Sequence, residues 1–316
     1  KELQNIKAKY GDERRTKVVA TSLGEFKEED LVPLEEAMIV LTDSGYIKRM
    51  NPTVVRVQHR GGKGMTGIST KEEDAVTHFV SCRTHDNALF FTSAGRVFQT
   101  KVWEIPEASR QSRGKAAVNF LALGPNEQIS AILTYNEKNL KEKGLEKYFV
   151  MATQNGIIKK TPITDFSSVR RSGLIAIKLK KGDSLKWAKA SSGEAQIIMV
   201  SSKSQAIRFS EKDARPLGRA TAGVIGIRLH KDDRVVGMDI IKISAGEKNQ
   251  KSPPKADPPL AEKLLVVMEN GFGKKTHLKF YKKQHRGGSG VKTAKITLKT
   301  GVIVAAFVVQ PETKEI

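Results

Sequence analysis

A basic loop rich in glycine occurs twice in this sequence, and its residue types could bind a polyanion. The first copy, QHRGGKG, spans 58–64, and the second, QHRGGSG, spans 284–290. Arginine and lysine provide charge for phosphate groups. Glycine has no side chain, so backbone N–H groups beside it can approach a phosphate closely. The two loops are therefore the first candidates for a binding site.

Residues that usually carry catalysis or bind metals form no recognisable site. The six histidines show no metal-ligand spacing, since His78 and His85 are seven positions apart, and the single cysteine, Cys82, excludes an intramolecular disulfide and a thiolate zinc site. GGKGMT at 61–66 lacks P-loop spacing. It also differs from a KH-domain loop, which joins two helices, because strand-like residues flank it. The sequence thus predicts binding and no active site.

The charge of the chain indicates a polyanionic partner. Lysine and arginine total 55 against 34 acidic residues, a formal net charge of +21 over 316 residues. A basic excess spread along the whole chain is typical of nucleic-acid binding. No segment has the length and apolar character of a membrane span, and the N-terminus has no apolar signal core, so we expect a cytoplasmic protein.

The elements that must position the loops form an internal repeat of five hairpins. Each has an apolar run of strand length, a tight polar turn and a second strand with basic residues. The hairpins span 38–50, 88–100, 148–160, 197–209 and 264–276. The turn contains Gly45, Gly95, Gly156 or Gly271, which suits a backbone position with positive φ. Gln205 takes this place in the fourth hairpin, which predicts a different turn there.

A basic, glycine-containing loop and further strand-like sequence follow each hairpin, so each unit has four strands. Four-stranded units in tandem predict an all-β fold of propeller-like blades. The blades are expected near 38–82, 88–135, 147–191, 196–241 and 263–309. They form one domain, 23–316, with inserts at 136–146 and 242–262; the second insert is rich in proline and charge and is expected to be an exposed loop.

The N-terminal residues differ from the rest. Leu3, Ile6 and Tyr10 are spaced three and four residues apart, which predicts a short helix.

The repeat predicts that cations recur along one rim. One arginine from each basic loop would lie at an equivalent place: Arg60, Arg113, Arg171, Arg219 and Arg286. The predicted rim also includes Lys48, Lys115, Lys159, Lys160, Arg170, Arg208, Lys274, Lys275, Gln284 and His285. A lone surface cation is usually only solvated, but repetition in register favours a binding surface. Such a rim suits duplex phosphates, whereas the low aromatic content of 6% does not suit stacking on single-stranded bases.

Together these residues resemble a known family, the C-terminal domain of the bacterial DNA gyrase A subunit. QHRGGKG stands where that family has its gyrase A-box in the first blade. Four further segments follow the family pattern: 84–123, 165–179, 213–229 and 269–290. YGDERRT at 10–16 resembles the stretch that joins the cleavage domain to this domain, so 1–22 is interpreted as a linker and the end of a cleavage-domain helix.

The resemblance implies a β-pinwheel, a propeller-like ring whose blades exchange strands, with duplex DNA wrapped around its basic outer edge. It implies that this wrap enables ATP-dependent negative supercoiling by a type II topoisomerase. The A-box role is carried onto Gln58, His59, Arg60, Gly61, Gly62, Lys63 and Gly64. The partners implied are double-stranded DNA, the gyrase A N-terminal domain and the gyrase B subunit. The isolated domain is expected to be a monomer.

The resemblance also implies that the chain has no catalytic activity alone. None of its five tyrosines follows an arginine, as the cleavage tyrosine of the family does. No cofactor is expected in this chain, and ATP and magnesium would be used by other parts of the holoenzyme.

Several alternatives stay open at the level of sequence. The family has a sixth blade, which would begin near 311–316, so either the chain is a fragment or the ring closes differently. Either box-like loop could anchor the DNA. An alternative function is that of a topoisomerase IV-like domain, which guides the choice of DNA crossing without wrapping. A protein-binding propeller of the WD or kelch type is a further alternative, which the charge disfavours.

Overall fold

The structure is a computed structural model that describes residues 1–12, 31–52, 74–109, 111–136, 146–167, 169, 172–242 and 262–309. Two compact units make up the chain, Lys1–Pro33 and Leu34–Ile316. In the first unit, α1 (Glu2–Tyr10) is the helix that the sequence predicts, and its apolar residues are exposed. The predicted boundary after residue 22 lies outside the described residues, as do nearly all of the two predicted inserts.

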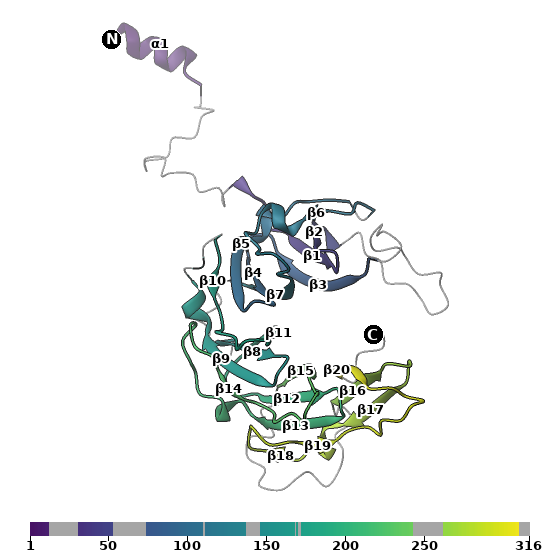
Figure 1. Cartoon of the computed structure of the whole chain (residues 1–316). Coiled ribbons are helices and arrows are strands. Elements are labelled where there is room, and N and C mark those ends of the chain that lie inside the picture. Colours follow the sequence, from purple (N-terminus) through teal and green to yellow (C-terminus); the bar gives the residue numbers. More distant parts are fainter. Residues whose placement is uncertain are drawn as a thin grey trace. The chain divides into compact units, whose positions relative to one another are not determined.

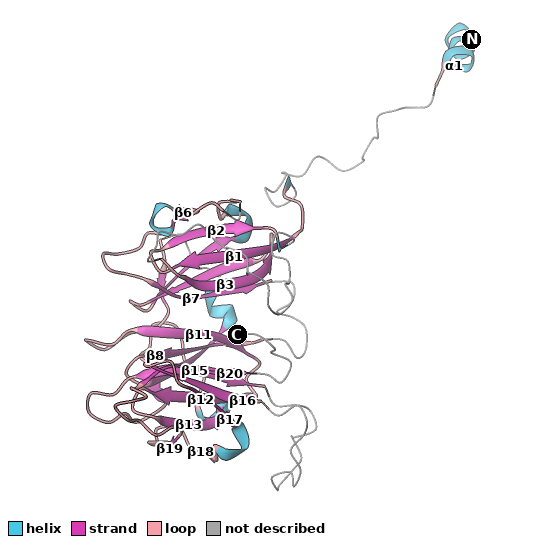
Figure 2. Cartoon of the chain, turned by 90° about the vertical axis from the view of Figure 1, so that its right-hand side faces the viewer, coloured by secondary structure: helices cyan, strands magenta, loops and turns pink. Residues whose placement is uncertain are grey.

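The second unit consists of five sheets that follow one another in chain order (Figure 1). Figure 2 shows that strands dominate this unit and that its helices are short. Sheet 1 contains β1 (Glu36–Thr42), β2 (Tyr46–Met50), β3 (Val76–Arg83) and β6 (Lys115–Ala116). Sheet 2 contains β4 (Asn87–Thr92), β5 (Arg96–Lys101), β7 (Ile129–Tyr135) and β10 (Leu174–Ile175).

The other three sheets repeat this arrangement. Sheet 3 contains β8 (Tyr148–Thr153), β9 (Ile157–Pro162), β11 (Leu185–Ser191) and β14 (Val224–Ile225). Sheet 4 contains β12 (Gln196–Ser201), β13 (Gln205–Ser210), β15 (Val235–Ile241), β18 (Lys283–Gln284) and β19 (Val291–Lys292). Sheet 5 contains β16 (Lys263–Met268), β17 (Gly273–His277) and β20 (Ile303–Val309). The predicted all-β fold of five blades is confirmed.

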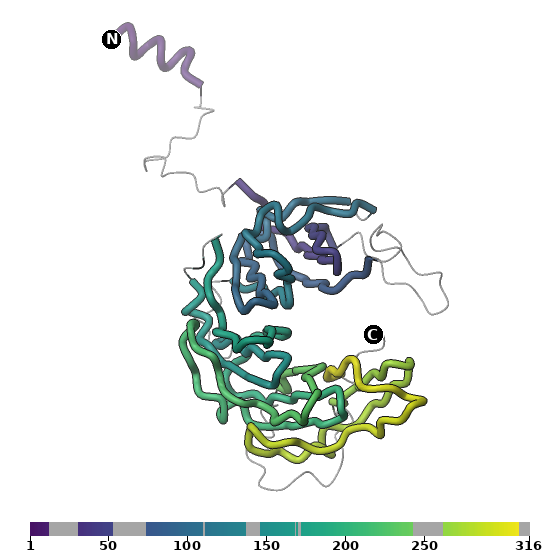
Figure 3. The backbone as a smooth tube through the Cα atoms, viewed as in Figure 1, coloured from purple at the N-terminus to yellow at the C-terminus, as the bar shows by residue number. Residues whose placement is uncertain are grey.

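Each of the first four blades takes its outermost strand from the next repeat of the chain. β6 pairs with β2, β10 with β5 and β14 with β9, while β18 and β19 pair with β13. The traced backbone shows each later segment crossing onto the earlier blade (Figure 3). This exchange of strands is the defining feature of the β-pinwheel that the resemblance implied. In the fifth blade, the described residues include no strand added to β17.

One backbone hydrogen bond recurs at every exchange. The donated segment, which we define as the stretch that one repeat adds to the preceding blade, donates an N–H to the carbonyl of that blade's hairpin turn. The four bonds run from Ala117 to Gly45 (2.9 Å), from Ala176 to Gly95 (2.8 Å), from Gly226 to Gly156 (2.8 Å) and from Thr293 to Ser204 (2.9 Å). Each accepting residue has a positive φ, between 74° and 84°. The turn therefore both closes the hairpin and receives the donated segment.

The turn of the fourth hairpin matches the others, so the predicted difference at Gln205 is wrong. Ser204 has a φ of 74°, and its N–H donates to the Ser201 carbonyl at 3.1 Å, as Gly45 does to Thr42. The Ser204 hydroxyl also contacts both backbone groups of Ala294, which supports a conformation that serine rarely adopts. Gln205 is simply the first residue of β13.

The hydrophobic core lies between the faces of successive blades. Ile39 of blade 1 packs with Phe90 of blade 2, and Ile198 of blade 4 packs with Val266 of blade 5. Between blades 2 and 3, the rings of Phe91 and Phe149 meet edge to face with centroids 5.7 Å apart. Burial of one such side chain contributes about 1.5–3 kcal/mol, so each pair of neighbouring blades is held together mainly by this interface.

Replacing Gly290 by alanine should weaken the exchange between blades 4 and 5. Gly290 has a φ of +80°, and an added Cβ would overlap with the carbonyl oxygen of Ala206 on β13. Gly182 has a similar φ of +78° but nothing within 4 Å of an added Cβ. Gly182→Ala should therefore lower the free energy of unfolding by about 1 kcal/mol through backbone strain alone. Gly290→Ala should cost at least about 1 kcal/mol more. Denaturant unfolding measures both, and equal losses would contradict this account.

Candidate nucleic-acid interface

Part of the predicted binding surface lies outside the described residues. This applies to the whole first box-like loop, 58–64, and to Arg170 and Arg171. Their contacts with nucleic acid stay predictions from sequence.

Lys48 and Lys159 are fully buried, which corrects their predicted place on an exposed rim. The Lys48 ammonium donates to the carbonyls of Ser109 (3.0 Å) and Ser112 (2.9 Å). Both carbonyls belong to the segment that the following repeat donates to blade 1. The lysine is buried because this segment covers the outer hairpin strand, which the sequence of one hairpin does not reveal.

Lys159 holds the exchange between blades 3 and 4 in the same way. Its ammonium donates to the carbonyls of Ala176 (2.7 Å) and Thr221 (3.2 Å), and also to that of Arg219. Burial lowers the pKa of Lys159 to about 8. Three carbonyl acceptors from two repeats therefore converge on one lysine that is costly to charge.

Lys160 is also buried, against a buried acid, and so does not belong to an exposed rim either. Its ammonium donates to the Glu211 carbonyl at 3.0 Å and lies 3.8 Å from the carboxylate of the same residue. Burial lowers the pKa of Lys160, and the charge of Glu211 opposes that shift. This pair connects blade 3 to the end of the hairpin of blade 4.

Two of the predicted arginines contact backbone carbonyls of neighbouring blades. Arg286, from the second box-like loop, donates to Asp213 (2.9 Å) and Ile225 (3.2 Å). Arg208 of β13 donates to Leu278 of blade 5 at 2.8 Å. Both side chains are half-buried, so part of their hydrogen-bonding capacity stabilises the fold.

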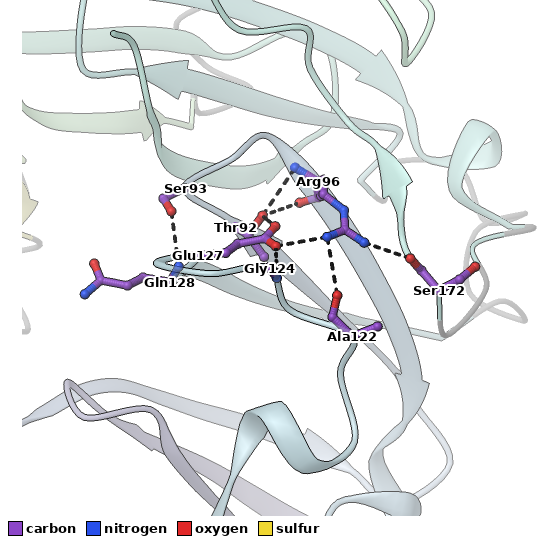
Figure 4. Close-up of polar contacts among 8 residues, drawn as sticks. All are labelled: Thr92, Ser93, Arg96, Ala122, Gly124, Glu127, Gln128 and Ser172. Atoms are coloured by element: carbon purple, nitrogen blue, oxygen red, sulfur yellow. Dashed lines mark hydrogen bonds and ion pairs between the residues drawn. The ribbon is translucent and has the colours of Figure 1, made fainter.

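Arg96 makes the corresponding contact between blades 2 and 3, and the sequence analysis missed it. Its guanidinium donates to Glu127 (3.0 Å) and to the carbonyls of Ala122 (3.3 Å) and Ser172 (2.9 Å), as Figure 4 shows. The third residue after the turn, where blades 1 and 3 have the buried lysine, is Phe98 in blade 2. Because Phe98 has no hydrogen-bond donor, the sequence indicates only indirectly that another side chain, here Arg96, stabilises this exchange.

The other predicted residues are exposed or half-buried. Arg113 lies over the Tyr46 ring, 4.0 Å from its centroid, and the Lys274 ammonium donates to the Thr293 carbonyl at 3.1 Å. His285 is exposed, with its Nδ1 3.6 Å from an oxygen of Asp213. Lys115 and Lys275 are exposed, and Arg219 and Gln284 are half-buried.

The second box-like loop packs on the segment donated by the preceding repeat. The Gly287 N–H donates to the Gly226 carbonyl at 2.7 Å, and the Arg228 N–H donates to the Gly288 carbonyl at 2.9 Å. Gly287 and Gly290 of the box both have a positive φ, and at Gly290 an added Cβ would overlap with the Ala206 carbonyl oxygen of β13. This is a structural requirement that a phosphate-binding interpretation alone would not give.

A row of exposed cations follows the donated strands, and these cations are not among the residues that the sequence predicts for binding. Lys178, Arg228 and Lys295 are each the fifth residue after the glycine that opens a donated segment. The two residues before each cation are buried, so the cation itself points to solvent. We call these three residues the edge row. Aligning the repeats on the donated segment instead of the hairpin turn would have found it.

Backbone hydrogen bonds connect members of the edge row to the next donated segment. The Lys178 N–H donates to the Thr221 carbonyl at 3.0 Å, and the Arg228 N–H donates to Gly288. Further exposed cations lie in the same segments: Lys180, Lys181, Lys231, Lys292 and Lys299. Two carboxylates in these loops point back to hairpin turns, since Asp183 accepts the Asn155 N–H and Asp233 the Lys203 N–H, both at 3.0 Å, whereas Asp232 is exposed. Exposed cations therefore outnumber exposed carboxylates in the segments that carry the edge row.

Other classes of site receive no support from the described part of the chain. In it, no three His, Cys, Asp or Glu side chains gather as a metal site would require. Its helices are too short or too polar to cross a membrane. Cys82 is buried beside the Ala37 carbonyl, and burial raises the pKa of its thiol to about 12, which makes it unsuitable as a nucleophile.

Comparison of sequences finds one family and many relatives. The family described as DNA gyrase C-terminal domain, beta-propeller, matches residues 36–83, 86–136, 147–192, 195–242 and 262–310. The A subunit of DNA gyrase from Staphylococcus epidermidis is 40% identical over 311 residues, which is 98% of this chain and 33% of that protein. Its counterpart from Mycolicibacterium smegmatis is 39% identical over 315 residues, 99% of this chain and 35% of that protein. The chain thus spans about a third of these relatives.

Comparison of structures gives the same fold. A DNA gyrase A C-terminal domain aligns with a TM-score of 0.63 and 26% identity, covering 87% of this chain and 83% of that one. The C-terminal domain of a DNA topoisomerase IV aligns with a TM-score of 0.68 over 88% of this chain and 79% of the other. Its 24% identity supports a shared fold and no more.

Replacing Lys159 by methionine should loosen the exchange between blades 3 and 4. Methionine fills similar space but leaves the carbonyls of Ala176, Arg219 and Thr221 without their donor. Because an unsatisfied buried acceptor costs about 1–3 kcal/mol, we expect the free energy of unfolding at pH 7 to fall by about 2–4 kcal/mol. Lys186→Met on the exposed edge of β11 is the control and should cost under about 0.5 kcal/mol.

The loss caused by Lys159→Met should grow with pH. The pKa of Lys159 is about 8 in the folded chain against an ordinary value of 10.5. Between these values the unfolded chain binds more protons, so the contribution of Lys159 to the free energy of unfolding rises with pH, by at most about 1.4 kcal/mol per pKa unit. Denaturation of both proteins at pH 8 and pH 10 measures the difference. A loss that shrinks with pH would contradict the assignment.

Proposed function

Because the chain belongs to the family of DNA gyrase C-terminal domains with a beta-propeller fold, we propose that it binds, bends and chirally wraps duplex DNA. The binding is independent of sequence, because it uses phosphate charge and not base edges. In the whole enzyme, with the gyrase A N-terminal domain and the gyrase B subunit, this wrap enables ATP-dependent negative supercoiling.

The observation that carries this proposal is the edge row. Lys178, Arg228 and Lys295 project to solvent at equivalent places of three successive repeats. A duplex that follows them meets a cation on each repeat, with Lys181, Lys231 and Lys299 close by in sequence. Repetition is what distinguishes a track for a polymer from scattered solvated charge.

The free-energy cost of bending the duplex determines how many phosphate contacts the chain needs to hold a wrap. Smooth bending of a 20–30 base-pair site by 40–90° costs on the order of 1–6 kcal/mol. A single loop cannot offset this cost, because one exposed charge pair contributes little in water. Several cations in register can, since each neutralised phosphate releases counterions and adds to the affinity.

Removing the edge row should weaken binding to duplex DNA to the same extent whatever the DNA sequence. The triple variant Lys178→Ala, Arg228→Ala, Lys295→Ala should lower the steepness of the plot of log affinity against log salt by about 1 per contact, about 3 in all. A matched variant, Lys147→Ala, Lys186→Ala, Lys242→Ala, removes the same charge from exposed lysines at or beside the starts and ends of β8, β11 and β15. It should change the slope by less than about 1.

Titration of a labelled duplex at several salt concentrations measures both variants. Equal losses would mean that only net charge matters, and the edge row would then have no special part in binding.

Replacing Arg60 and Lys63 by alanine should separate wrapping from strand passage. In a reconstituted holoenzyme this double variant should abolish negative supercoiling and leave relaxation of supercoiled DNA intact, because the box would act on the wrap and not on cleavage. A topoisomer assay measures both activities. Equal loss of the two would count against a dedicated wrapping role for 58–64.

An experiment with this chain alone, and not with the holoenzyme, distinguishes the topoisomerase IV-like alternative. A domain that only guides the choice of DNA crossing should bind DNA without changing the linking number of a nicked circle that is sealed around it. A domain that wraps DNA should change it.

A further inference from the structure

At the contact between blades 4 and 5, the innermost strand of blade 4 has a glycine against the backbone of the next blade. The innermost strands of these blades, β15 and β20, pack closely on each other. Gly237 of β15 lies directly on Ala306 of β20: an added Cβ would overlap with the Ala306 carbonyl oxygen and lie 2.8 Å from its Cβ. The two backbones therefore leave no room for a side chain at residue 237.

The repeat makes this glycine unusual. By strand register, the residue at this place is His78 in blade 1, Ala131 in blade 2, Trp187 in blade 3 and Ala305 in blade 5. In all four, a side chain extends from the strand. Only in blade 4 does the repeat provide glycine at this place. In blade 1 the His78 side chain contacts Ser130 of blade 2, and in blade 2 Ala131 is buried among residues of blade 3, so side chains occupy the space that backbone occupies between blades 4 and 5.

A charged group two residues further along secures the same contact. One carboxylate oxygen of Asp239 accepts the Val308 N–H of β20 at 2.9 Å. The other lies 2.6 Å from the Lys189 ammonium of β11 and accepts the Ile240 N–H. Asp239 thus connects blades 3, 4 and 5. At the equivalent places blades 1, 2 and 5 have the apolar residues Val80, Leu133 and Phe307. These side chains cannot accept the hydrogen bond that Asp239 accepts from the next blade.

We propose that Gly237 and Asp239 are positioning residues for the DNA wrap: by fixing how closely blade 5 lies on blade 4, they set the course of the duplex from Arg228 to Lys295. The inference rests on the proposed function. Both residues lie on the inner strands, away from the donated segments that carry the edge row, so they act on DNA only through the spacing of the blades. A change in the spacing of blades 4 and 5 alters the position of Lys295 relative to Arg228, while the number of exposed cations stays constant.

The test compares the linking-number change with the affinity for DNA. Gly237→Ala in this chain adds one methyl group at the contact, and Gly273→Ala on β17 is the matched control, since its added Cβ would have no neighbour closer than 3.7 Å. For each protein, a nicked circle is sealed by ligase with the chain bound, and the affinity of a linear duplex and its salt dependence are measured. We expect Gly237→Ala to lose at least half of the linking-number change per bound chain and to keep its affinity within about threefold, while Gly273→Ala matches the unmodified chain.

A second pair of variants keeps the test decisive if Gly237→Ala folds poorly. Asp239→Asn retains an oxygen for the Val308 N–H and should keep most of the linking-number change. Asp239→Leu removes that acceptor and should lose it, again with affinity maintained.

Each outcome decides between the possibilities. An unchanged linking number in both Gly237→Ala and Asp239→Leu overturns the inference and leaves the proposed function standing. A parallel fall in affinity and linking-number change also overturns it, because the residues would then act on binding and not on the course of the DNA. If the unmodified chain binds DNA but changes no linking number, the proposed wrapping fails, and the inference fails with it.

Discussion

The exchange of an edge strand between successive repeats is the constraint on which this structure depends. A three-stranded hairpin unit would leave the outer strand with unpaired backbone groups, which is unfavourable and prone to wrong pairing. The following repeat covers that edge with a strand of two residues, and a turn residue with positive φ accepts a hydrogen bond from the residue that follows this strand. Because the donated strand is so short, its neighbouring carbonyls need other donors. Lys48, Lys159, Arg96 and Arg286 provide them.

The basic residues therefore divide into two sets with different tasks. One set is buried or half-buried at the exchanges, where carbonyl oxygens surround ammonium and guanidinium groups. The other set, which includes Lys178 and Arg228, is exposed and lies three residues after the end of the donated strand. Counting cations along the sequence overestimates the surface available to DNA, because part of the charge of +21 maintains the fold. The two sets are nevertheless coupled, since the segment that a buried lysine holds in place also carries an exposed cation.

In the function that we propose, binding and shape depend on opposite edges of the blades. Exposed cations lie by the donated segments at the outer edge, while Gly237 and Asp239, which we propose set the spacing of blades 4 and 5, lie on the inner strands. Bending DNA costs energy that grows with curvature. A binding surface with a fixed curvature can hold a particular bend only if its blades keep their spacing. The hydrophobic interfaces between blades, such as the one that contains Phe91 and Phe149, provide the rigidity that this requires.

The sequence by itself determined the fold class, the number of repeats, the hairpins and the polyanionic character, because strand length, turn glycines and net charge are local or additive properties. It also located the helix at Glu2–Tyr10. The assignment of the fourth turn to Gln205 was wrong by one residue, because that turn has no glycine to mark its position; the eighth residue of the hairpin, like Gly45 and Gly95 in theirs, is Ser204. The sequence could not show that Lys48 and Lys159 are buried or that Lys178, Arg228 and Lys295 form a row. Those facts depend on which segment covers which strand, and the covering segment comes from about 60 residues away in the chain, as with Lys159 and Thr221. Only the tertiary structure decides that pairing, because burial is a property of the neighbours that a residue acquires on folding.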